Sequence, residues 1–147
     1  MVDALADLSS RSEIHSLNEL VMAAADVNKN HFAQKAELIE KAVKGVTLYA
    51  SSSDKALGLS GLIARGERLG KVGPDGPFTY DGLDSIDVSE MGDDAFSANH
   101  STYATGPLVE DMARIIRFDT RPPSSRTPRI RAMPEGSSHP RYWKFVD

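Results

Sequence analysis

The sequence predicts an α/β fold in which a parallel sheet lies between two layers of flanking helices. Runs that are apolar or rich in β-branched residues, typical of buried strands, occur at residues 20–24, 46–50 and 85–89. Segments with helical periodicity precede, separate and follow these runs. This alternation favours parallel strands joined by right-handed crossovers. We expect about three strands and four helices.

The first two expected helices are identified by their apolar faces. Val2, Leu5 and Leu8 lie on one side of a short helix that ends near Ser9. A longer helix is expected within residues 28–45, where the apolar positions step by four, three and four residues, at Phe32, Ala36, Ile39 and Val43. Gly45 follows and ends it.

The later elements are less regular. Residues 54–66 predict a helix weakened by two internal glycines, and residues 65–84 are rich in glycine, proline and aspartate, as loops are. A long loop precedes a helix at 107–118, in which Pro107 suits the first turn. The remaining residues are proline-rich and are expected to be irregular until the aromatic end "RYWKFVD". The sequence therefore divides into a domain at 1–118 and a Pro/Arg-rich tail at 119–147.

Charge is distributed unevenly along the chain. Residues 1–113 carry a net charge of −9 and residues 114–147 a net charge of +5. A basic tail can bind nucleic acid, but here the arginines are scattered among prolines with no aromatic platform before Tyr142. We expect the tail to pack on the acidic body of its own chain, and we expect no nucleic-acid partner.

Composition restricts the classes of protein to which the chain can belong. The chain has 147 residues, 40% of them hydrophobic and 26% charged, as in soluble globular domains, and it has no cysteine. No histidines pair at metal-ligand spacing, so neither a metal nor a cofactor is expected. The N-terminus lacks the features of a signal peptide, and no apolar run is long enough to span a bilayer. We expect a cytoplasmic protein.

Three residues with catalytic side chains follow the expected strands. Asp26 comes after the first strand, Asp54 after the second, and His100 lies in the loop after the third. Because parallel strands end at one edge of a sheet, these side chains are expected at the same edge, where they would form the acid and base of a nucleophilic triad. The alternative interpretation is that Asp54 only caps a helix and that His100 is solvated in its loop.

Several motifs resemble those of a known family. The segments are "LNELVMAAADVNKNHF", "VTLYASSSDKALGLS", "GLDSIDVSEM" and "NHSTYATGPLVEDMARII", followed by "YWKF". In this order and spacing they are similar to the C-terminal half of a bacterial α/β-hydrolase family of unassigned function, within the esterase/lipase superfamily. The resemblance runs from about Leu17 to the end of the chain.

The resemblance implies a role for each candidate residue. Asp54 would be the triad acid and His100 the triad base, with Asp26 as the alternative acid. Asn99 stands where the family usually has glycine before the histidine, and Ala25 stands where it usually has proline. Neither difference removes a catalytic group. The implied substrate is a small acyl ester.

The nucleophile of that family is not found in the sequence. It sits on a G-x-S-x-G turn, and "GLSGL" at residues 58–62 has the wrong spacing. The turn would precede the helix at 2–8, so Met1 is expected just downstream of it. A chain truncated there is expected to be inactive alone and to expose the edge of the strand around Val21.

Three hypotheses remain open. The chain is part of a serine hydrolase whose serine comes from a missing segment or a separate chain. Alternatively, it is a non-catalytic interaction module or a decayed hydrolase fragment, which would form a homo-oligomer or bind a partner through the exposed strand edge. Nucleic-acid binding through the basic tail is the third and is disfavoured by the acidic remainder of the chain.

Overall fold

The computed structural model describes residues 1–11, 17–52, 67–91 and 106–146. The described helices are α1 (Val2–Ser10), α2 (Lys29–Ala42) and α4 (Pro107–Phe118), with single 3-10 turns η1 (Ser89–Met91) and η2 (Pro123–Ser125). The strands are β1 (Leu20–Ala23), β2 (Val46–Ala50), β3 (Leu83–Asp87), β4 (Ile130–Met133) and β5 (Tyr142–Phe145). None of the described helices is long and apolar enough to cross a bilayer.

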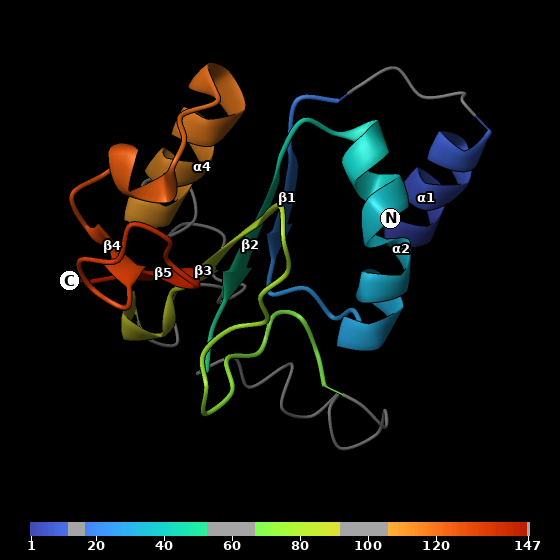
Figure 1. Ribbon diagram of the computed structural model, residues 1–147. Coiled ribbons are helices and arrows are strands. Elements are labelled where there is room, and N and C mark those ends of the chain that lie inside the picture. The colour runs from blue at the N-terminus through green and yellow to red at the C-terminus, as the bar shows by residue number, and fades with distance from the viewer. Residues whose placement is uncertain (12–16, 53–66, 92–105, 147) are drawn as a thin grey trace.

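The strands form one sheet in the order β1-β2-β3-β5-β4 (Figure 1). The β1–β2, β2–β3 and β3–β5 pairs are parallel, and β4 runs antiparallel to β5. The α/β class is confirmed. The expectation of three strands is wrong, because the proline-rich segment after residue 118 adds β4 and β5 to the same sheet. Each of these strands has only four residues, too few to show a clear strand pattern in the sequence. They are strands because they pair with each other and with β3.

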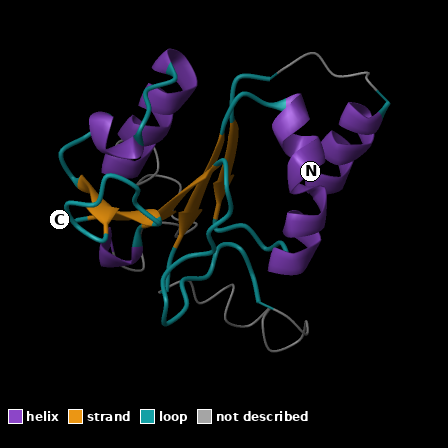
Figure 2. Cartoon of the chain, viewed as in Figure 1, coloured by secondary structure: helices purple, strands orange, loops and turns teal. Residues whose placement is uncertain are grey.

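Helices cover both faces of the sheet, α1 and α2 on one side and α4 on the other (Figure 2). The residues of β2 alternate between two clusters: Leu48 packs with Phe32 and Ile39 of α2, whereas Tyr49 packs with Leu108 of α4. All five residues of β2 are buried, as expected for a strand covered on both faces. The predicted three-layer arrangement is therefore present.

Strand β1 forms an edge of this sheet. Among the described residues it pairs only with β2, as expected for the strand around Val21. The N–H groups of Leu20 and Ala24 donate to carbonyls of the β2 segment. Because the backbone N–H and C=O groups of successive residues point to opposite sides of a strand, those of Val21 and Ala23 point away from β2, toward the open edge. This edge carries no charge or proline of the kind that protects natural edge strands.

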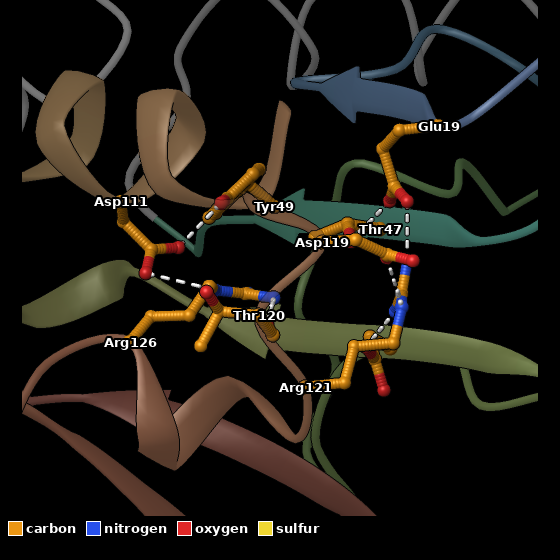
Figure 3. A network of polar contacts seen from close by, with 9 residues as sticks. Glu19, Thr47, Tyr49, Asp111, Asp119, Thr120, Arg121 and Arg126 are labelled. Atoms are coloured by element: carbon orange, nitrogen blue, oxygen red, sulfur yellow. Dashed lines mark hydrogen bonds and ion pairs between the residues drawn. The ribbon is translucent and has the colours of Figure 1, made fainter. Parts of the chain in front are cut away.

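The basic C-terminal segment packs on the acidic body, as expected. Arg121 forms an ion pair with Glu19, which precedes β1 (Figure 3), and another with Asp84 of β3. The Glu19 side chain is only 4% exposed, and it also accepts a hydrogen bond from the Thr47 hydroxyl at 2.7 Å. The backbone at Gly45 allows this close approach, because a Cβ atom there would overlap the Arg121 guanidinium. Arg121 and Glu19 therefore link β1, β2 and β3 near their amino-terminal ends.

A second buried network joins β2, α4 and the C-terminal segment. The Tyr49 hydroxyl donates to one Asp111 oxygen at 2.5 Å, and Arg126 Nε donates to the other at 2.9 Å (Figure 3). The side chains of Asp111 and Arg126 are fully buried. Burial, and then the neighbouring Asp111 carboxylate, raise the pKa of Tyr49 far above its ordinary value of 10. The hydroxyl is therefore a fixed donor.

Candidate active site at the carboxyl edge of the sheet

The carboxyl ends of the first three strands lie side by side. Residues Ala23 and Tyr49 are register partners in β1 and β2, and Ala50 and Asp87 are register partners in β2 and β3. The ladder continues one residue further, where Val88 N–H donates to the Ala50 carbonyl at 2.8 Å. In open α/β sheets this is the edge where ligands bind. The segments that leave it therefore begin next to one another.

Asp26 lies just beyond the end of β1. One of its carboxylate oxygens is 3.1 Å from Nε of Arg68, and its side chain is 54% exposed, whereas that of Arg68 is 15% exposed. Asp26 lies in the segment that leaves β1, and Arg68 lies in the segment that leads to β3. The structure thus places Asp26 at the predicted edge, and its described partner is a guanidinium.

The two principal candidates, Asp54 and His100, lie outside the described residues. The chain positions from which they depart are described: β2 ends at Ala50, four residues before Asp54, and β3 ends at Asp87, thirteen residues before His100. Because Ala50 and Asp87 are register partners, both segments start from adjacent points of the edge.

A hydrogen-bonded clasp links these two starting points. The Ser89 hydroxyl donates to Asp87 at 2.5 Å and accepts the backbone N–H of Ser52 at 2.9 Å. The Asp87 carboxylate also accepts the Ser89 N–H at 2.9 Å, and Asp87 is 8% exposed. A buried carboxylate is costly unless it is hydrogen-bonded, and here two donors meet this requirement. The clasp therefore fixes the exit of β2 relative to that of β3.

Sequence reasoning missed this clasp, although half of it has a local signal. An aspartate that accepts the N–H of the residue two positions on is a common turn motif, and Asp87 and Ser89 have that spacing. The contact with Ser52 spans 37 residues and depends on the β2–β3 register. A pattern within a single segment cannot reveal it.

A further ion pair supports the same edge from the C-terminal strands. Lys144 of β5 contacts Glu90 of η1 at 2.7 Å, and this hydrogen bond raises the pKa of the lysine. In the part of the chain that the structure describes, no group of three or more acidic or histidine side chains is placed to hold a metal ion. The carboxyl edge of the described sheet thus carries two carboxylates, those of Asp26 and Asp87.

Comparisons with known proteins give one match. A family model described as "Alpha/beta hydrolase of unknown function (DUF900)" matches residues 1–118. No curated protein and no solved structure matches significantly. The matched region contains β1, β2 and β3, which are three of the four mutually parallel strands, and all three described helices that cover the sheet. On the match to four-fifths of its length, the chain belongs to the alpha/beta hydrolase family of unknown function DUF900.

Proposed function

We propose that this chain contributes the acid and base of a serine hydrolase acting on small acyl esters. Asp54 holds the imidazole of His100 in the correct tautomer and stabilises its charged form. His100 accepts the proton of the attacking serine and returns it to the leaving group. Asp26 is the alternative acid. It forms an ion pair with Arg68, but Arg68 Nε makes no hydrogen bond with it.

The observation that carries this proposal is the register pairing of Ala50 with Asp87. It starts the Asp54 and His100 segments at neighbouring points of the carboxyl edge, and the Ser52–Ser89–Asp87 clasp holds those points together. Triad acids and bases of α/β-hydrolases follow successive strands in this chain order. Membership in an α/β-hydrolase family supports the same assignment.

The nucleophile, in this proposal, is supplied by a strand that docks parallel to β1. Residues 1–147 contain no G-x-S-x-G turn. Helix α1 begins beside the carboxyl end of β1, since Met1 and Val2 line a pocket of about 250 Å³ together with Ala23, Ala25 and Val27. Helix α2 likewise begins near the carboxyl end of β1 and leads to the start of β2.

Helices α1 and α2 both begin near the carboxyl end of β1, and this shared position determines the orientation of the docking strand. A right-handed β–α–β unit that included α1 would place its first strand on the open side of β1, parallel to it and ending near Met1. The outward-facing backbone groups of Val21 and Ala23 provide its hydrogen-bonding partners. A serine at the end of such a strand would lie at the same edge as the segments carrying Asp54 and His100.

Labelling of the purified chain with a fluorophosphonate probe tests the assignment of the nucleophile to another segment. Hydrolysis of p-nitrophenyl acetate is measured in parallel, with His100→Ala as the control. A chain without its nucleophile neither reacts with the probe nor turns over the ester above the His100→Ala background. Labelling that disappears in His100→Ala would show that a serine within residues 1–147 is the nucleophile.

A second candidate function is a non-catalytic interaction module, favoured by the unprotected β1 edge and its apolar pocket. It predicts self-association or partner binding that survives His100→Ala and is lost in Val21→Lys, which places a charge on the edge. A chain that sediments as a monomer and unfolds in one cooperative transition would count against this alternative.

A further inference from the structure

A groove on the far side of the sheet has a composition that the proposed hydrolase chemistry does not explain. It has a volume of about 480 Å³ and lies between one side of α4 and the η2 turn. Its lining is Glu110, Ala113, Arg114, Arg117, Phe118, Thr120 and Ser125. The α4 positions are spaced by three and four residues, so they form one continuous stripe along the helix.

One end of this groove lies at the C-terminal end of α4, toward the amino-terminal edge of the sheet. The residue after α4 is Asp119, which contacts Arg121, and Arg121 binds Glu19 at the amino-terminal end of the sheet (Figure 3). The C-terminal end of α4, where Arg117 and Phe118 line the groove, therefore lies toward the opposite edge of the sheet from Asp87 and Ser89.

The charges of the groove favour one negative charge in the ligand. Arg114 is paired with Glu110 at 2.8 Å, whereas Arg117 makes no ion pair or hydrogen bond with any described residue. One guanidinium is therefore available and can bind a carboxylate through two parallel hydrogen bonds. The Glu110 carboxylate in the same groove disfavours a doubly charged phosphate.

The remaining lining is suited to an apolar body attached to that carboxylate. Phe118 is 72% exposed, and Ala113 leaves room on the helix surface. The hydroxyl-bearing residues Thr120 and Ser125 form the opposite side. The volume lies within the range of about 300–1,000 Å³ for small-molecule pockets.

We propose that this groove binds an amphiphilic monocarboxylate, with its carboxylate on Arg117 and its apolar chain along Ala113 and Phe118. Glu110 opposes binding in two ways, by repelling the carboxylate and by occupying Arg114. Removing the charge of Glu110 and removing that of Arg117 should therefore change affinity in opposite directions.

Titration of the full chain with octanoate, followed by two-dimensional NMR, tests this proposal, and octanamide serves as the uncharged ligand of the same shape. We expect octanoate to shift resonances of residues 110–125 and to bind at least about fivefold more tightly than octanamide. Arg117→Gln should weaken octanoate binding at least about fivefold, and Glu110→Gln should tighten it about twofold or more.

Arg131→Gln is the matched control, since Arg131 is an exposed arginine of β4 that does not line the groove and is paired with Glu135. Its affinity for octanoate should equal that of the wild type. Arg117 lies in the last turn of α4, where a cation stabilises a helix, so the thermal midpoint of each variant is measured alongside. No octanoate binding by folded wild-type chain, equal affinity for octanamide, or unchanged affinity in folded Arg117→Gln would overturn the proposal.

Discussion

Arg126 of the C-terminal segment donates from Nε to Asp111 of α4 at 2.9 Å, and both side chains are completely buried. Tyr49 holds the second carboxylate oxygen of Asp111, so the three groups form one network across β2, α4 and the C-terminal segment. The Arg126 Nη2 atom has no hydrogen-bond partner among the described residues. Such a network is costly to desolvate, and removing one partner leaves an uncompensated buried charge.

Breaking this pair should therefore destabilise the chain strongly. We expect Arg126→Met to lower the free energy of unfolding by about 3–5 kcal/mol, as measured by urea denaturation. The exposed pair of Arg114 with Glu110 is the matched comparison, and Arg114→Met should cost no more than about 1 kcal/mol. Similar losses of unfolding free energy in the two variants would show that burial does not make the Arg126–Asp111 pair more important for stability than an exposed pair.

Gly45 is predicted to be intolerant of even one added methyl group. A Cβ atom there would overlap the guanidinium of Arg121 and the carboxylate of Glu19, so the ion pair must move. We expect Gly45→Ala to lower the free energy of unfolding by about 1–3 kcal/mol. Gly73→Ala is the control, because its Cβ would meet only the Gly76 carbonyl at 3.8 Å. Equal stabilities of the two variants would contradict the close approach at Gly45.

Asp84 should make stability depend on pH in a direction opposite to that of an ordinary ion-paired aspartate. Burial raises the pKa of Asp84 above its ordinary value, and this effect outweighs the lowering by Arg121. A raised folded-state pKa means that the contribution of this group is fully present below the unfolded pKa. It is lost as pH rises through the folded pKa.

Asp84→Asn, which cannot titrate, should therefore gain stability relative to the wild type as pH rises from about 3.5 to 7. The measurement is the difference in unfolding free energy between the two proteins at each pH. Other carboxylates cancel in this difference. A difference that changes in the opposite direction would show that the attraction of Arg121 dominates over burial.

The sequence predicted the elements whose pattern is local. Strand 46–50 and helix 107–118 match the structure to the residue, because apolar runs, helix periodicity and Pro107 are properties of one segment. The third strand lies at Leu83–Asp87 instead of 85–89, since Asp84 is accommodated in a strand by Arg121, 37 residues away. Strands β4 and β5 are four residues long, and their pairing is likewise set by distant parts of the chain.

The candidate site was predictable only in outline. Strand order along the chain indicates that Asp26 and the segments of Asp54 and His100 leave the same edge, and the β1–β2–β3 register supports this for the strand ends. The contact of Ser89 with Ser52 and the pairing of Asp26 with Arg68 depend on loops whose paths have no periodicity. Such contacts follow from the folded structure alone.

The most direct test of the proposed acid–base pair is an NMR titration of His100 in the wild type and in two matched variants, Asp54→Asn and Asp26→Asn. A carboxylate that contacts an imidazole stabilises its charged form, so removing the charge of Asp54 should lower the pKa of His100 by about one unit or more. Asp26→Asn should leave this pKa unchanged. A His100 pKa that responds to Asp26→Asn instead would assign the acid to Asp26, and a pKa that responds to neither variant would contradict the proposed pair.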